Sequence, residues 1–340
     1  MMIYLEHDQL EIQCPEVHDH ARCSISFQRT LRIPDDGRDY PLPPGLGEFP
    51  LRHLDDYAER VPTEWVRRGG VIMPMFQAEA MWLNFDGYHA YPFALKIATG
   101  KVCAITGENR VNHLNTDPQD YLVLPEQLWL DGYCVEKGVI RQFVAMPLGK
   151  GYTVEEQLKG SAQHGGLQIT AFPMKAERYE AIRAWDGRYP SNPPKLMAQQ
   201  SPEEDSMGLA PGGRMRQEIY EDEYGLDAWD QRHPARCFIT IANSAQWKAI
   251  TGERPPIEPP TAQQYTEAGL PWYDYYDADH EAVSGSDILK SVQSVSQTGK
   301  EKGETALPDN ESIHGTRVVS IRDTRKRKVR EYSASESMDS

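Results

Sequence analysis

Two arginines and a glutamate alternate directly after a glycine pair, in the stretch Gly212-Gly213-Arg214-Met215-Arg216-Gln217-Glu218-Ile219-Tyr220. Side chains alternate along a β-strand, so Arg214, Arg216, Glu218 and Tyr220 would share one face. The two guanidinium groups could bind a substrate anion while Glu218 moves a proton, and the glycines would let the backbone approach a ligand closely. The commoner alternative is a solvated strand face with cross-strand ion pairs.

Two further residues could complete such a site. Arg141 lies just after the Lys137-Gly138 turn, where it would extend a polar strand face or cap a sheet edge. His164 precedes Gly165-Gly166, a flexible setting that suits a catalytic imidazole, although a lone loop histidine is usually only solvated. The candidate catalytic residues are therefore Glu218 and His164, and the candidate substrate-binding residues are Arg214, Arg216, Arg141 and Tyr220.

A second set of residues has the side-chain types of a zinc site. Cys14, His18, His20 and Cys23 form a Cys-x3-His-x-His-x2-Cys pattern, and four such ligands could surround one zinc ion. The spacing is not one of the common structural zinc patterns. Cys23 also begins an alternating apolar stretch, so its thiol would point into the core. The favoured interpretation is a hairpin with two buried thiols and two polar histidines, and we predict no metal and no cofactor.

The densest group of rings lies in Gly269-Leu270-Pro271-Trp272-Tyr273-Asp274-Tyr275-Tyr276-Asp277. Rings beside carboxylates could recognise a cation or a sugar. More often, closely spaced Trp and Tyr at the end of a folded region pack back over its core. We predict this packing role, with Trp272 buried. A Trp272 exposed in a groove would instead favour the ligand surface.

The negative charge of the chain lies before residue 281. The net charge is -15, yet residues 281–340 contain ten acidic and ten basic residues, so residues 1–280 carry 41 acids against 26 bases. Nucleic acids and anionic bilayers are bound through Lys and Arg, so neither is expected as a partner. The expected partner is therefore an unknown protein or a small molecule.

Several features favour a cytoplasmic location. The longest apolar runs are too short to span a bilayer, and the N-terminus has no apolar signal-peptide region. Five cysteines in a long chain do not indicate a disulfide framework. Near the end of the chain, Arg325-Lys326-Arg327-Lys328 with Arg330 is typical of a nuclear-localisation stretch or of an ordinary charged segment in a disordered tail.

Short strands and turns dominate the expected fold. Apolar Cys23, Ile25, Phe27, Leu31 and Ile33 alternate with polar residues, a pattern typical of a strand with one buried face. Two short helices are expected at 153–159 and 244–251, since each begins at residues suited to capping. The sequence therefore predicts an α+β fold whose β-rich body has short, mainly antiparallel strands and a few short helices.

The domain boundaries follow from composition. We predict a β-rich domain at residues 1–185 and a long loop or linker at 186–212, where five prolines fall. A second part at 213–280 would pack on the first, or 1–280 would form one domain. Residues 281–340 are rich in Ser, Lys, Gln and Glu and are expected to form a mostly disordered tail.

Several blocks resemble a family of uncharacterised soluble proteins found widely in microbes. They are residues 29–34, 212–222, 269–277, 289–292 and 307–312, and the resemblance spans residues 20 to about 315. It implies no activity, cofactor or catalytic residue. It does suggest that residues 281–315 are more than a disordered tail.

No common catalytic motif is present. The chain has no Gly-x-Ser-x-Gly elbow, no phosphate-binding Gly-Lys-Ser/Thr loop and no His-Glu-x-x-His helix. We therefore expect a soluble binding or interaction protein. The alternative is a metal-independent enzyme that acts on a small anionic substrate through the Arg214, Arg216 and Glu218 strand face.

Overall fold

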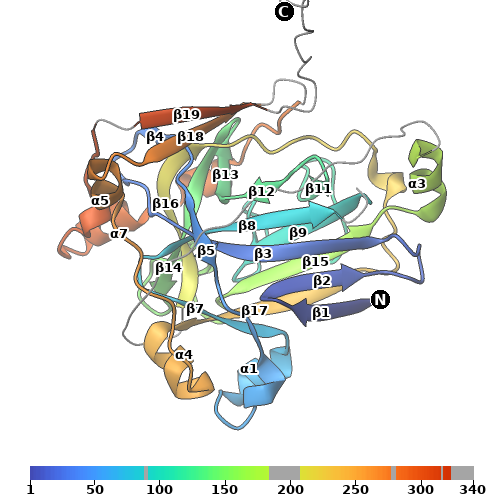
Figure 1. The fold of residues 1–340 in the computed structure, drawn as a ribbon, viewed down its shortest axis with the longest axis horizontal. Helices are drawn as coiled ribbons and strands as arrows, with labels where there is room; N and C mark the ends of the chain where they lie inside the picture. Colours follow the sequence, from blue (N-terminus) through green and yellow to red (C-terminus); the bar gives the residue numbers. More distant parts are fainter. Residues whose placement is uncertain (88–90, 184–206, 277–280, 315–316, 323–340) are drawn as a thin grey trace, which may run out of the picture.

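The computed structural model describes residues 1–87, 91–183, 207–276, 281–314 and 317–322. These residues form a strand-rich body with mainly antiparallel pairing and short helices (Figure 1), which confirms the predicted β-rich character of the fold. The first strands are β1 (Met2–Glu6), β2 (Gln9–Gln13), β3 (Arg22–Thr30), β4 (Asp39–Tyr40), β5 (Gly45–Glu48), β6 (Arg52–His53), β7 (Val71–Met75), β8 (Ala80–Gly87), β9 (Phe93–Thr99) and β10 (Val102–Cys103).

The remaining strands are β11 (Leu122–Leu124), β12 (Trp129–Leu130), β13 (Gly132–Glu136), β14 (Val139–Pro147), β15 (Leu167–Pro173), β16 (Met207–Arg216), β17 (Ala235–Asn243), β18 (Pro271–Tyr276) and β19 (Arg317–Arg322). The α-helices are α1 (Thr63–Arg68), α2 (Val154–Lys159), α3 (Ala176–Arg183), α4 (Ser244–Thr251), α5 (Ala262–Glu267), α6 (Asp287–Ser291) and α7 (Val295–Glu301). Short 3₁₀ turns are η1 (Leu54–Tyr57), η3 (Leu226–Ala228) and η4 (Pro308–Asn310).

One series of antiparallel pairings runs through most of the body. It follows the order β1, β2, β3, β8, β14, β16, β17, β15 and β9. In addition, β7 pairs with β17 and β4 with β16, both in parallel. Strands from residues 207–243 therefore lie between strands from the first half of the chain. The two parts expected at 1–185 and 213–280 share this sheet.

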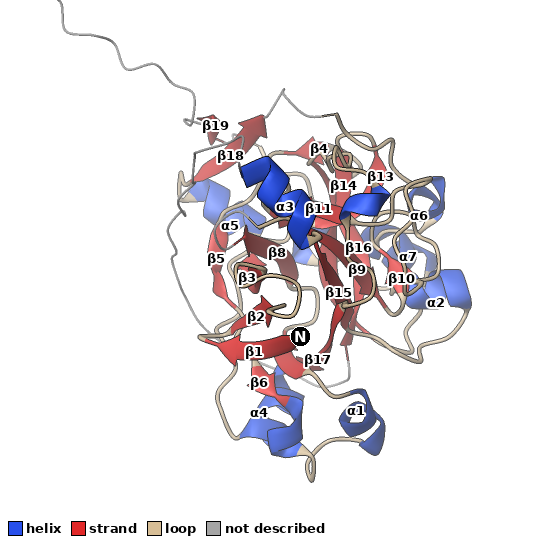
Figure 2. Cartoon of the chain, turned by 90° about the vertical axis from the view of Figure 1, so that its right-hand side faces the viewer, coloured by secondary structure: helices blue, strands red, loops and turns tan. Residues whose placement is uncertain are grey.

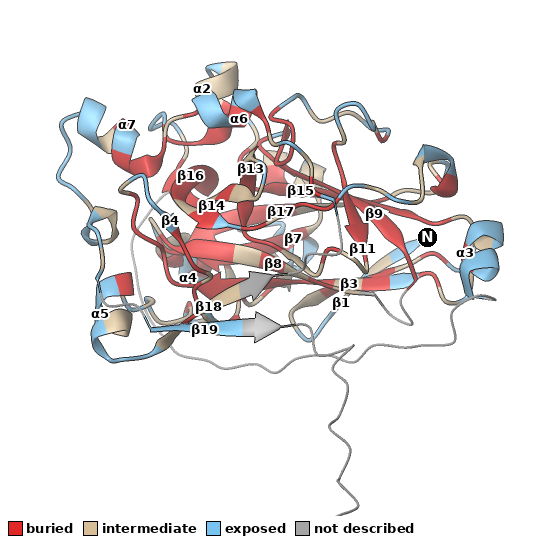
Figure 3. Cartoon of the chain, turned by 90° about the horizontal axis from the view of Figure 1, so that it is seen from above, coloured by how far each residue is buried: buried red, intermediate tan, exposed pale blue. Residues whose placement is uncertain are grey.

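The apolar faces of these strands enclose one large core. Figure 2 shows β1, β2 and β3 on one side of the body and β9, β15 and β17 on the other, and Figure 3 shows buried residues concentrated in the strands. The main cluster draws on β2, β3, β8, β9, β14, β15 and β17. Cys23, Ile25, Phe27, Leu31 and Ile33 are all fully buried, as their alternation predicts. The expectation of a single buried face is wrong, because the intervening polar residues Ser26, Gln28, Thr30 and Arg32 are buried too.

Two predicted helices are confirmed together with their caps. The Thr153 hydroxyl accepts from the Glu156 N–H and the Glu156 side chain from the Thr153 N–H, which starts α2. Asn243 caps α4, which ends at Gly252 in the left-handed region.

The prediction of a loop up to residue 212 is wrong for residues 207–212, which begin β16. This strand is buried along most of its length, although it contains Gly208, Pro211 and the Gly212-Gly213 pair. Pro211 is accommodated because the β14–β16 register shifts between Arg141 and Phe143, and a bulge tolerates proline. A Cβ on Gly213 would lie 2.2 Å from the Pro34 carbonyl oxygen, so the glycine permits close strand packing. Residues 184–206 lie outside the described residues.

The prediction of a mostly disordered tail from residue 281 is wrong for residues 281–314. This arm, defined as residues 281–314, contains α6, α7 and η4, and it buries Leu289, Val292 and Val295. The arm is rich in polar residues, and hydrogen bonds to side chains of the body help to hold it in place. Gln157 donates to the Gln293 carbonyl and accepts from the Gln293 N–H, at 3.0 and 2.8 Å. Polar composition alone therefore concealed an ordered segment.

The aromatic segment packs as predicted. Trp272 on β18 is fully buried, and its indole N–H donates to the Thr266 hydroxyl at 3.1 Å. The rings of Tyr40 and Tyr265 lie 6.4 and 6.3 Å from it, measured between centroids. Tyr273 exchanges backbone hydrogen bonds with Leu42, which ties the segment to the N-terminal half.

Two sequence predictions remain, one on the basic stretch near the end of the chain and one on membrane-spanning segments. The basic stretch Arg325–Arg330 lies outside the described residues. Within the described residues, every helix is too short or too polar to cross a bilayer.

A buried carboxyl group in this body should control part of its pH-dependent stability. Asp131, between β12 and β13, is 4 % exposed, and burial raises its pKa to about 7, although the Trp129 indole N–H that it accepts at 2.6 Å opposes this. The folded state therefore holds the Asp131 proton over a pH range in which the unfolded state has lost it. This contribution lowers stability as the pH rises from about 4 to about 7.

We predict that Asp131→Asn flattens this pH dependence. Asparagine keeps an acceptor for Trp129 and has no proton to lose, so the variant should gain stability over the wild type between pH 5 and 8, by at most about 4 kcal/mol. Urea unfolding at several pH values measures the difference. The exposed Asp56→Asn variant is the control and should show no such trend. Parallel pH profiles for Asp131→Asn and the wild type would contradict the prediction.

Candidate functional site

The predicted anion clamp is occupied by the protein's own carboxylates. The Arg214 guanidinium donates to Asp39 at 2.8 Å and to both Glu136 oxygens at 3.2 and 3.3 Å. Lys290 of α6 lies 3.1 Å from Glu136. Bonds from Arg214 and then Lys290 lower the pKa of Glu136 to about 2. This arrangement matches the ion-paired strand face that the sequence left open as the alternative.

The other residues of that predicted face differ in their secondary structure and burial. Strand β16 ends at Arg216, which is exposed and lies 3.8 Å from Asp274. Glu218 follows the strand end, and Tyr220 is 8 % exposed, so the expectation that all four residues share one face is wrong for Tyr220. Arg141 opposes Arg214 in the β14–β16 register and donates to the Val292 carbonyl, which fastens the arm.

The cysteine and histidine pattern does not converge. Cys14 and Cys23 are fully buried, and burial raises the pKa of the Cys14 thiol to about 12, which disfavours the thiolate that zinc needs. His18 instead contacts the Glu180 carboxylate at 2.9 Å and packs against the rings of Tyr91 and Tyr179. Within the described residues, no group of three or more His, Cys, Asp or Glu side chains is placed to hold a metal ion.

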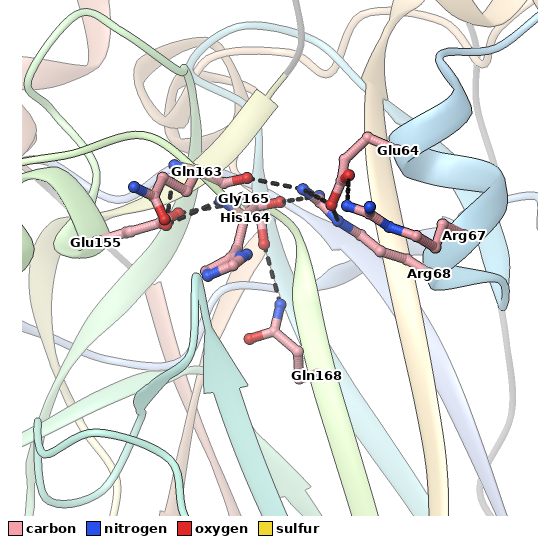
Figure 4. Close-up of polar contacts among 8 residues, drawn as sticks. All are labelled: Glu64, Arg67, Arg68, Glu155, Gln163, His164, Gly165 and Gln168. Atoms are coloured by element: carbon pink, nitrogen blue, oxygen red, sulfur yellow. Dashed lines mark hydrogen bonds and ion pairs between the residues drawn. The ribbon is translucent and has the colours of Figure 1, made fainter.

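His164 lies apart from Arg214, in a segment fixed by a buried carboxylate. Glu155 of α2 is 2 % exposed and accepts hydrogen bonds from the backbone N–H groups of Gln163, His164 and Gly165, at 3.1, 2.9 and 2.8 Å (Figure 4). Three donors compensate a charge that would otherwise be costly to bury. The segment between α2 and β15 is therefore held in one conformation.

Arg68 of α1 holds the other side of the same segment. Its guanidinium donates to the carbonyls of His164 and Gln163 at 2.8 and 2.7 Å, and Glu64 pairs with it (Figure 4). Gln168 completes the arrangement, because it donates to the Gly165 carbonyl and accepts from the Lys101 N–H at 2.6 Å. The polar backbone groups are thus satisfied by side chains from three other elements.

The imidazole of His164 itself makes no hydrogen bond to any described residue, and it projects from this segment in Figure 4. Burial lowers its pKa, and the nearby cations Lys101, Arg68 and Lys159 lower it further, whereas Glu155 opposes them. Burial likewise lowers the pKa of Lys159, and Lys101 lowers it further, whereas Glu155 opposes both. Cations therefore neighbour cations here, and we call Arg68, Lys101, Lys159 and His164 the cationic face.

An open groove adjoins the cationic face. Its volume is about 340 Å³, and Val102, Leu158 and Ile288 provide its apolar walls. Glu108, Asn109 and Lys159 supply polar groups, and Gly107 completes the lining. Lys159 belongs to both surfaces, since its ammonium also donates to the carbonyls of Gly100 and Lys101 at 3.0 Å each. The groove is open to solvent and combines apolar with polar groups.

Sequence reasoning named His164 as a candidate and did not name the residues around it. Arg68, Lys101, Glu155 and Lys159 come from separate segments and carry no motif. The turn between β9 and β10 is a local feature, and it places Lys101 at an exposed hairpin tip. No protein-family model, curated protein or solved structure matches the chain. The resemblance to a microbial family therefore gains no support from these comparisons.

We predict that Glu155→Gln releases the 163–165 segment. A charged acceptor contributes more per hydrogen bond than a neutral one, so the loss should be about 2–3 kcal/mol of unfolding free energy. Hydrogen exchange of the Gln163, His164 and Gly165 amides should accelerate well beyond the global change. Glu156→Gln is the matched control, because glutamine keeps the capping box. Equal exchange rates at these amides in both variants would refute the assigned role of Glu155.

Proposed function

We propose that this chain is a binding protein that receives an anionic ligand on the cationic face, with the remainder of the ligand in the adjoining groove. The observation that carries the proposal is the grouping of like charges around His164. Burial lowers the pKa of this residue, and Lys101, Arg68 and Lys159 lower it further against the opposing charge of Glu155, in a protein whose net charge is -15. Perturbed pKa values beside grouped like charges are more frequent at functional sites than elsewhere.

The cations differ in how far the protein already uses them. Arg68 is fully engaged by two carbonyls and Glu64, and Lys159 by two carbonyls. The Lys101 ammonium, in contrast, makes no ion pair with any described residue, and it stands at an exposed turn. Lys101 and His164 would therefore contact the ligand, whereas Arg68 and Lys159 would add positive potential behind them.

The groove supports a ligand with an apolar part. Leu158, Val102 and Ile288 would contact this part, and Asn109 would offer an amide for a hydrogen bond. Binding fits the site better than catalysis does. In the described residues, no carboxylate is hydrogen-bonded to His164 to orient its imidazole, as a general base requires.

Sulfate tests the proposal because its charge stays constant over the pH range in which His164 titrates. We expect saturable binding in calorimetry, and at least a tenfold loss of affinity in Lys101→Glu. Lys137→Glu, which makes the same charge change at the exposed turn between β13 and β14, is the control and should bind as the wild type does. Absence of saturable binding, or equal affinity in the two variants, would overturn the proposal.

The pH dependence gives a second, independent prediction. The lowered pKa leaves His164 neutral near pH 7, and a bound dianion would favour the imidazolium form. Sulfate affinity should therefore rise as the pH falls from 7.5 to 6.0, and the His164 NMR titration should move to higher pH when sulfate is present. In His164→Gln the affinity should be nearly independent of pH. An unchanged slope in that variant would assign the effect to another group.

A further inference from the structure

Two more cations, Arg110 and Arg236, lie near Thr170, farther along the same sheet. Thr170 of β15 is opposite both Lys96 of β9 and Arg236 of β17. The guanidinium of Arg110 reaches over this row and donates to the Thr170 hydroxyl. Lys96 is neutralised by Asp120 at 2.5 Å, but Arg110 and Arg236 form no ion pair with any described residue. They are defined here as the arginine pair.

The arginine pair has the features of an anion subsite. Arg110 is half-buried, its Nε is buried and makes no hydrogen bond to a described residue, and its other nitrogens donate to Thr170 and Asn112. Burial lowers the pKa of Arg110, and the neighbouring charge of Arg236 lowers it further. Two guanidinium groups without a carboxylate suit a phosphate or another compact oxyanion, which they bind through several N–H groups.

The sheet geometry places the arginine pair beside the cationic face. Gln168 lies two residues before Thr170 on the same strand face, which corresponds to about 7 Å along the strand. Gln168 binds both Lys101 and Gly165, and the Arg110 N–H donates to the Lys101 carbonyl at 3.0 Å. Hydrogen bonds through Gln168 and the Lys101 backbone thus link the cationic face to the arginine pair.

We infer that the ligand is a linear oligophosphate, with one phosphate group at Lys101 and His164 and another at the arginine pair. The inference rests on the proposed function and adds the chemical class and the length of the ligand. Two anion subsites about two strand residues apart would bind linked phosphates better than a single oxyanion. A long nucleic acid would extend onto a body with 41 acids against 26 bases, which would repel it.

The test compares sulfate, pyrophosphate and tripolyphosphate on the full chain. Sulfate binding is followed through the His164 NMR resonance, so that it reports on the first subsite alone. We expect tripolyphosphate to bind the wild type at least tenfold more tightly than sulfate. Arg236→Gln and Arg110→Gln should each remove most of this gain and leave the sulfate response at His164 within about twofold of the wild type.

Arg232→Gln is the control, because Arg232 is an exposed arginine on the same approach to β17 and pairs with Asp230. Arg236 is exposed, so its variant should fold even if the half-buried Arg110 variant does not, and thermal unfolding checks this. Equal affinities for sulfate and tripolyphosphate, or an unchanged gain in Arg236→Gln, would overturn the inference while the proposed function stands. No sulfate response at His164 would overturn the proposed function itself.

Discussion

The buried charge of Glu155 is the constraint on which this part of the molecule depends. A carboxylate that is 2 % exposed must find donors within the protein. The backbone of residues 163–165 supplies them, so the segment after α2 has to fold over the carboxylate. That fold presents the Gly165 carbonyl to Gln168, and Gln168 in turn fixes the Lys101 turn. The positions of His164 and Lys101 therefore both follow from one ionised group.

The same constraint reaches into neighbouring elements. A Cβ on Gly100 would lie 2.4 Å from Glu155 atoms, so the hairpin between β9 and β10 needs a glycine where it passes the carboxylate. Arg68 supports the opposite side of the segment and packs its guanidinium over the Phe238 ring at 5.3 Å. Helix α1, β17 and the β9–β10 hairpin thus all contact Glu155, Arg68 or the segment that these two side chains hold. These contacts keep the cationic face in a fixed arrangement.

Local patterns in the sequence predicted the local features of this fold. The burial of the apolar residues from Cys23 to Ile33 and the caps of α2 and α4 depend on residues close in sequence, and each is observed. The burial of Trp272 was also predicted, although Tyr40, which packs against it, is far away in sequence. The start of β16 was missed because Gly208 and Pro211 are usually loop residues, and the register shift between Arg141 and Phe143 that accommodates Pro211 cannot be read from the sequence. The candidate site could not be predicted in this way. Strand register brings Thr170 and Arg236 together, and Arg110 reaches Thr170 from a loop, and no local pattern records either contact.

Because the arm is folded and lines the groove, its late position in the chain affects when the groove is completed during protein synthesis. Ile288, on α6, forms one wall of the groove, and the contacts that hold α6 in place include the hydrogen bond from the Ser286 N–H to the Cys134 carbonyl. A ribosome completes the whole sheet body, with its strands from β1 to β17, before it reaches residue 288. During synthesis the body can therefore assemble around its core while the groove still lacks a wall. The groove therefore gains this wall only after all the strands from β1 to β17 have been synthesised.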